Sequence, residues 1–165
     1  MNNELTKLDI KKMQEELDYR KLTLMPEQIA EVQLARSHGD LSENFEYKAA
    51  KQALNRNKSR MRYLEKMIKT AHIIEDTAAE DEVGLFDIIE LEFGDGDTEK
   101  IQVVTTVRCN PLEGRISKES PMGMALLGKK AGQTVNVNSE DGNYSVKIIS
   151  IQKCEDDGSA PLLSY

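Results

Sequence analysis

Apolar residues recur every three or four positions across residues 1–78, with charged residues between them. This spacing is typical of helices that pack through one apolar stripe. Two such stripes are present, each with one polar exception, Arg20 in the first and Asn57 in the second. The apolar members of the first are Ile10, Met13, Leu17 and Leu24, and those of the second are Tyr47, Ala50, Leu54, Met61, Leu64, Ile68 and Ala71. Folding the chain between the stripes brings Ile10 to Ala71, Met13 to Ile68 and Leu17 to Leu64. The first 78 residues are therefore predicted to form an antiparallel coiled-coil hairpin.

Local signals mark where these helices begin, bend and turn. Thr6 and Asp9 are placed to cap the first helix. Pro26 should kink or locally break it, because proline has no amide hydrogen and crowds the preceding turn. Gly39 is a helix stop, and Asp40 or Ser42 is a helix start. The hairpin tip is expected at residues 38–43.

The pattern changes after a polar joint at residues 75–82. Segments rich in β-branched residues predict four strands, at residues 83–93, 101–107, 134–137 and 144–151. Between the second and third, Ser120, Pro121 and Gly128 mark the cap, first turn and end of a short helix. We therefore expect a small antiparallel sheet with one short helix over residues 79–153, a loose tail at 154–165, and an α+β fold overall.

Composition excludes several classes of protein. Residues 1–78 hold 14 basic and 13 acidic residues, whereas residues 79–165 hold 8 and 16, which supports two modules. With a mean hydropathy of −0.54 and no long apolar run, the sequence indicates neither a membrane span nor a secretory signal. Cys109 and Cys154 fit no metal spacing, and we expect reduced thiols in a cytoplasmic protein, with one disulfide left open.

Acidic residues gather at the expected turn: Asp40, Glu43 and Glu46. Carboxylates on a protruding turn can enter the cavity of another molecule and offer oxygen ligands to Mg²⁺, which usually takes one or two carboxylates and fills its other positions with water and phosphate. The competing interpretation is that Asp40 or Ser42 caps the second helix while the glutamates complement its dipole. Composition alone favours capping.

Basic residues follow on the second helix: Lys48, Lys51, Arg56, Lys58, Arg60 and Arg62. They are suited to sequence-independent contacts with RNA phosphates, or they form an ordinary solvated face of the coiled coil. The chain has no nucleophile elbow and no phosphate-binding loop. It is not expected to be an enzyme on its own.

The run from Ala35 to Tyr47, ARSHGDLSENFEY, resembles the tip signature of the GreA/GreB family of transcript cleavage factors. Shorter matches stand in the same order: Leu5-Thr6, Glu15-Glu16-Leu17, Ala49-Ala50-Lys51, Gly114-Arg115-Ile116-Ser117, Ser120-Pro121 and Ala125-Leu126-Leu127-Gly128-Lys129. The resemblance spans about residues 5–152. It implies an FKBP-like C-terminal domain that docks on bacterial RNA polymerase, and a hairpin that enters the secondary channel.

In that family the polymerase cuts the extruded 3′ end of backtracked nascent RNA, and tip acids assist. The resemblance assigns this role to Asp40 and Glu43, which would share a Mg²⁺ ion of the polymerase active site; the factor has no cofactor of its own. Ser42, Asn44 and Tyr47 would support the tip, and Lys51 and Arg56 would contact RNA. Polymerase docking would fall to Ser120, Pro121, Leu126 and Gly128. We expect a monomer that binds no membrane.

Departures from the family pattern keep alternatives open. Asp9 stands where glycine is usual, Met25 and Met124 where arginine is common, and Phe45 replaces a small residue beside the tip. Residues 102–110 lack the usual pattern, and the tail is longer than typical. One alternative is a related factor that occupies the channel and regulates polymerase without cleavage. A prolyl isomerase or chaperone is a third, but it needs an aromatic-lined pocket that this chain is poorly equipped to build.

Overall fold

The computed structural model describes residues 3–40 and 43–164. The chain divides into two compact units, residues 10–72 and residues 1–9 together with 73–165. The sequence placed a boundary at residue 78. The first residues instead join the second unit, because the amide of Ile74 donates to the carbonyl of Leu5 over 2.9 Å, where β1 (Glu4–Leu5) pairs with β2 (His72–Ile73).

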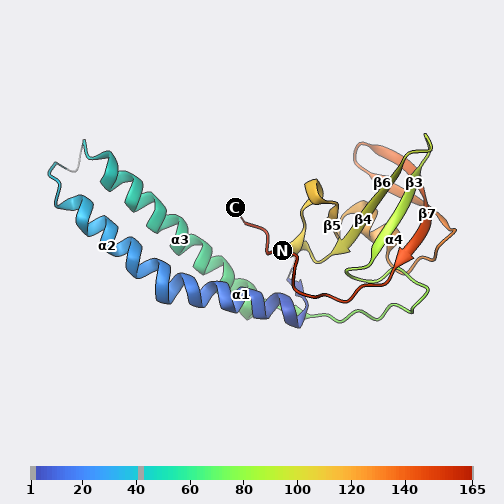
Figure 1. Cartoon of the computed structure of the whole chain (residues 1–165), viewed down its shortest axis with the longest axis horizontal. Coiled ribbons are helices and arrows are strands. Elements are labelled where there is room, and N and C mark those ends of the chain that lie inside the picture. The colour runs from blue at the N-terminus through green and yellow to red at the C-terminus, as the bar shows by residue number, and fades with distance from the viewer. Residues whose placement is uncertain (1–2, 41–42, 165) are drawn as a thin grey trace. The chain divides into compact units, whose positions relative to one another are not determined.

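The hairpin has two helical arms, as predicted. One arm consists of α1 (Lys7–Tyr19), the π-helical turn η1 (Arg20–Leu24) and α2 (Met25–Arg36), and α3 (Phe45–Thr70) returns beside it (Figure 1). Most of its buried apolar side chains lie on the predicted stripes, but Ala35 is buried off the stripes and Met67 is buried where Ile68 was expected. The full set is Met13, Leu17, Ala35, Tyr47, Leu54, Met61, Leu64 and Met67. The apolar spacing therefore located both helices and their packed faces.

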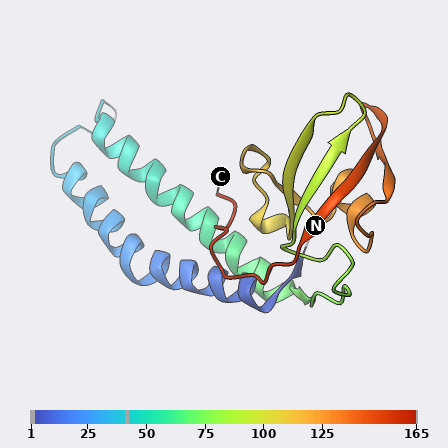
Figure 2. The ribbon, with the colours of Figure 1, turned by 45° about the vertical axis from the view of Figure 1, so that its right-hand side comes forward.

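Pro26 does not break the first arm. The helix instead widens over residues 20–24, where the Met25 amide donates to the carbonyl of Arg20, five residues back. Such a turn accommodates an extra residue and loosens the backbone ahead of a proline that cannot donate. The arm is curved where it passes through this region (Figure 2).

Polar residues occupy the seam beside this turn. Arg60 donates from Nε and Nη2 to the two Glu16 carboxylate oxygens over 2.9 and 3.1 Å, and Arg20 Nε donates to Glu16 over 2.7 Å. Arg20 Nη1 also donates to Asn57 Oδ1 over 3.0 Å. Burial raises the pKa of Glu16, but hydrogen bonds and charge from Arg60 and Arg20 outweigh it and leave that pKa below 4.5. Arg60 is thus a buried partner of Glu16 and not part of the solvated basic face.

The second unit contains a five-stranded sheet in the order β5-β4-β3-β7-β6. The strands are β3 (Ile88–Phe93), β4 (Thr98–Val104), β5 (Arg115–Ser117), β6 (Thr134–Ser139) and β7 (Gly142–Gln152), and α4 (Pro121–Leu126) packs on them. The sheet is mixed and not wholly antiparallel, because β5 pairs parallel to β4. Three residues without alternation gave no sequence signal for β5. The fold class, α+β with one short helix in this unit, is as predicted.

The segment before β3 is buried without being a strand. Phe86 has a φ of +68°, which an extended strand does not allow, and its ring is 4% exposed. Its amide donates to the carbonyl of Val103 over 2.7 Å. The first strand of the five-stranded sheet, β3, therefore begins at Ile88 and not at Val83 as predicted.

Arg108 lies fully buried on the ring of Phe86, with its Cζ atom 4.6 Å from the ring centroid. Its Nε is 3.3 Å from Oδ1 of Asp9, which is also fully buried, and its Nη2 pairs with Asp156. Asp9 also accepts from the Thr6 amide at 2.9 Å, which completes the predicted cap. These contacts hold the first helical turn on the second unit.

The segment after β7, predicted to be a loose tail, instead packs on the second unit. Leu163 donates its amide to the carbonyl of Val107 over 2.6 Å, and Ala160 is 7% exposed. Cys154, at the start of the segment, and Cys109 are both free thiols, so the disulfide is excluded. No helix in the described part of the chain is long and apolar enough to cross a membrane.

Candidate functional site at the hairpin tip

Asn44 closes the hairpin and caps its second helix. Its Oδ1 accepts from the Tyr47 amide over 3.0 Å, and its Nδ2 donates to the carbonyl of Ala35 over 2.7 Å. One side chain thus satisfies an orphan donor at the start of α3 and an orphan acceptor near the end of α2. The sequence assigned this cap to Asp40 or Ser42; Ser42 lies outside the described residues.

The three acids of the tip have different surroundings. Glu46 Oε2 lies 2.9 Å from Nδ1 of His38, so these two side chains bind each other. Asp40 and Glu43 are exposed in the turn that precedes the Asn44 cap. Glu43 therefore has no capping role in α3, and its side chain is exposed, as is that of Asp40.

The donor chemistry of Asp40 and Glu43 fits Mg²⁺, a hard cation that takes carboxylate oxygens and retains water. Across residues 3–40 and 43–164, no group of three or more His, Cys, Asp or Glu side chains is placed to hold a metal ion. A cation bound by Asp40 and Glu43 would need further oxygen ligands from water, RNA or another protein. This arrangement suits an ion shared across an interface.

Tyr47 packs behind the tip between positive charges. It is 9% exposed, with the Arg36 guanidinium 5.5 Å and the Lys51 ammonium 5.7 Å from its ring centroid. A hydrogen bond from Arg36 lowers the pKa of Tyr47 below 10.0; burial opposes this and the charge of Lys51 adds to it. Lys51 is exposed beside Tyr47, and Arg56 is exposed further along α3. The structure brings Lys51 to the ring of Tyr47, whereas Arg56 lies elsewhere on α3.

Phe45 projects from the first position of α3. The side chain is 79% exposed, and Lys48 Nζ lies 5.6 Å from its ring centroid. Sequence comparison noted only the added bulk of this residue. The described structure shows an exposed aromatic ring paired with a lysine next to the acidic turn.

The four expected docking residues separate into two kinds. Ser120 caps α4 by accepting from the Gly123 amide over 3.0 Å, and Pro121 follows it on the surface. Gly128 is exposed with a φ of +77°. Leu126 is fully buried in the core of the sheet, so its side chain offers no surface to a partner and its assignment is corrected. Met124, 64% exposed on the same helix, is a surface residue that sequence reasoning did not assign to docking.

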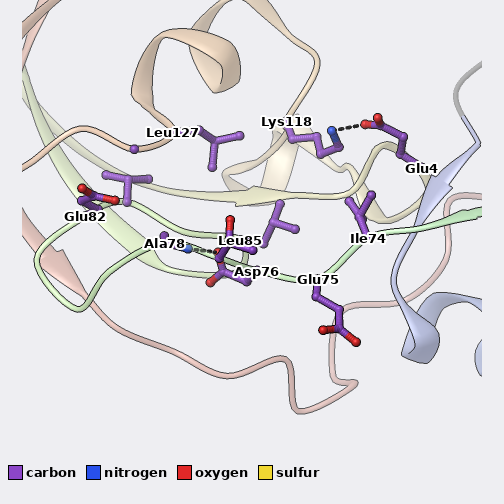
Figure 3. A pocket seen from close by; sticks show the side chains of 12 residues that line it. Glu4, Ile74, Glu75, Asp76, Ala78, Glu82, Leu85, Lys118 and Leu127 are labelled. Carbon is purple, nitrogen blue, oxygen red and sulfur yellow. Dashed lines mark hydrogen bonds and ion pairs between the residues drawn. The ribbon is translucent and has the colours of Figure 1, made fainter.

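An open pocket of about 420 Å³ lies near Gly128 (Figure 3). Ile74, Leu85 and Leu127 line it together with acidic residues, and Lys118 pairs with Glu4 at one side. None of its lining residues is aromatic. The pocket therefore lacks the surface that a prolyl isomerase would use to bind proline.

Two family matches cover nearly the whole chain. Residues 3–73 match "Transcription elongation factor, N-terminal", and residues 78–153 match "Transcription elongation factor, GreA/GreB, C-term". The chain belongs to the GreA/GreB family of transcription elongation factors. It is similar to transcription elongation factor GreA of Lactococcus lactis subsp. cremoris strain SK11, with 41% identity over 89% of this chain and 96% of the relative. GreA of Bacillus subtilis strain 168 is 40% identical over 85% of this chain and 90% of its own.

A crystal structure of GreA factor homolog 1 (Gfh1) of Thermus thermophilus is 29% identical to this chain. The match covers 91% of this chain and 98% of the Gfh1 chain, with a TM-score of 0.42.

Proposed function

We propose that this elongation factor inserts its hairpin tip into the secondary channel of bacterial RNA polymerase and stimulates cleavage of backtracked nascent RNA. The observation that carries the proposal is that the polar side chains of the tip have different surroundings. Asn44 caps α3 and Glu46 pairs with His38, while Asp40 and Glu43 are exposed at the turn. Two exposed carboxylates close to a capped helix start are suited to act at a site completed by another molecule.

The proposed chemistry is hydrolysis of a phosphodiester bond by the polymerase. A shared Mg²⁺ ion would supply charge stabilisation and an activated water. The carboxylates of Asp40 and Glu43 would bind that ion at coordination positions that the polymerase leaves open, and they would accept hydrogen bonds from the attacking water. Asn44 and Tyr47 would hold the start of α3 in place, and this matters because small displacements of reacting groups reduce rates strongly.

Charge on α3 supports the RNA part of the proposal. Lys51 and Arg56 are exposed, so their cationic groups can reach phosphates of the extruded transcript. Ser120, Pro121 and Gly128 would contribute to docking on the polymerase. The factor would act as a monomer in the cytoplasm and would have no cofactor of its own.

The test uses backtracked elongation complexes with 3′-labelled RNA and Mg²⁺. Wild-type protein should release short 3′ fragments, whereas Asp40→Asn or Glu43→Gln should abolish stimulation and still compete with wild type for the polymerase. Glu46→Gln is the matched control, because it removes a carboxylate that is paired with His38; it should retain most of the stimulation. Full activity of either Asp40→Asn or Glu43→Gln contradicts the proposal.

The exposure of Phe45 favours one alternative, a channel-occupying regulator without cleavage activity. A bulky ring beside the acids could hold them away from the reacting phosphate. That alternative predicts binding without fragment release by wild type, and a gain of cleavage in Phe45→Ala.

A further inference from the structure

Phe45 is held at a fixed place, two residues after Glu43. It lies between Asn44, which bonds to both helices of the hairpin, and the buried Tyr47. Its backbone is therefore anchored while its ring is 79% exposed. An aromatic side chain this exposed contributes little to folding, and its face is accessible to a molecule outside the chain.

The ring and its neighbour have the chemistry of a nucleotide-binding pair. Lys48 stands one turn further along α3, with Nζ 5.6 Å from the Phe45 ring centroid. Aromatic rings stack on nucleobases with little regard to sequence, and a nearby lysine attracts the phosphate of the same strand. An apolar protein wall would gain nothing from an ammonium group at the edge of the contact. The charge at this site therefore favours RNA over an apolar protein surface.

We propose that Phe45 stacks on a nucleobase at the extruded 3′ end of the transcript, with Lys48 beside a phosphate of the same strand. The inference rests on the proposed function, since the acids would act on a phosphodiester bond of the same extruded segment. Stacking would hold the 3′ segment while Asp40 and Glu43 act. Phe45 is thus a substrate-contacting residue, and the chemical step is left to the acids.

The first experiment measures the concentration of factor that gives half-maximal cleavage, together with the cleavage rate at saturation. Phe45→Ala should raise that concentration about 5- to 150-fold, the range expected for the loss of one stacked base. The saturated rate should change much less. Phe45→Trp should restore tight binding, whereas Phe45→Leu, which keeps apolar volume without an aromatic face, should behave like Phe45→Ala.

Transcripts with an abasic 3′ nucleotide provide the control for the base itself. Wild type should then bind as weakly as Phe45→Ala does on intact RNA, and the substitution should cost nothing further. Binding to polymerase that has not backtracked should be equal for all four proteins. Circular dichroism should show unchanged helix content, because the side chain is exposed.

A second experiment does not depend on cleavage. The Asp40→Asn protein is bound to complexes carrying 4-thiouridine at the RNA 3′ end, and photocrosslinks to the factor are mapped. Crosslinks at the start of α3 that disappear with Phe45→Ala and persist with Phe45→Trp support the stack.

Equal activity of Phe45→Leu and wild type, or an undiminished Phe45→Ala penalty on abasic RNA, overturns the inference in favour of a protein contact. In that case the proposed function survives if Asp40→Asn is inactive. If wild type releases no fragments and the Asp40→Asn protein gives no crosslink, both proposals fail.

Discussion

Arg108 gives the sharpest test of how the second unit is held together. The substitution Arg108→Met replaces a fully buried cation by an apolar side chain of similar length, and it leaves the fully buried carboxylate of Asp9 without its ion-pair partner. Removing one partner of a buried ion pair costs about 3–5 kcal/mol. Asp9 retains the hydrogen bond from the Thr6 amide, and the Asp156 carboxylate, with 16% of its side chain exposed, can turn to water. We therefore expect the lower end, about 3 kcal/mol.

Calorimetry at pH 7 measures this loss directly. For a chain of this size about 3 kcal/mol lowers the melting temperature by about 6–12 °C. Adding Asp9→Asn should recover part of the loss, because the neutral amide no longer leaves a buried charge unpaired, and the double-mutant cycle should show about 2 kcal/mol of coupling. Arg108→Lys should also destabilise the protein, since a single ammonium cannot reproduce the fork that reaches two carboxylates. A cost below about 1 kcal/mol, with no rescue by Asp9→Asn, would refute the reasoning.

Three further perturbations test the hairpin and α4. The pKa of Glu16 is lowered below 4.5 in the folded hairpin. Its pairing with Arg60 therefore stabilises the fold above that pH, and this stabilisation is lost as the pH falls through the folded pKa. In melts monitored by circular dichroism from pH 7 to 3, Glu16→Gln should be less stable than wild type at pH 7 and should converge with it in acid. A methyl group on Gly123 would collide with the backbone around β5, so Gly123→Ala should cost about 1–3 kcal/mol in urea unfolding, whereas Gly94→Ala, which meets no atom within 4 Å, should cost little. Asn44→Ala should cost about 1 kcal/mol through loss of the cap and should increase hydrogen exchange at the start of α3; unchanged exchange there would contradict the bracing role.

Local patterns in the sequence predicted the features that depend on local physics. The three-four spacing located the packed faces of both helices, because a buried stripe must follow the helical period. Ser120 and Pro121 predicted the start of α4, where Ser120 Oγ accepts from the Gly123 amide. Thr6 and Asp9 predicted the first cap, in which the amide of each residue donates a hydrogen bond to the side-chain oxygen of the other.

Features that depend on distant partners were missed. Arg60 looked like any basic residue of α3, and only Glu16 on the facing helix makes its burial favourable. Strand β5 is stabilised by pairing with β4 and not by its own three residues. The N-cap at Asn44 was missed because several capping residues stand in sequence at this turn, and the choice among them depends on the carbonyl of Ala35 across the hairpin.

Three departures from the family pattern meet in one buried cluster. Asp9 stands where the resemblance leads one to expect glycine, Arg108 lies in the segment that lacks the usual motif, and Asp156 belongs to the longer tail. In the structure Arg108 binds both acids and rests on the ring of Phe86. The charges of Asp9 and Arg108, both fully buried, would not be tolerated there alone, because a buried ion without a partner is strongly destabilising. They are therefore best understood as one coupled change in how the second unit holds the first helical turn and the tail, and this change leaves the acids of the tip untouched.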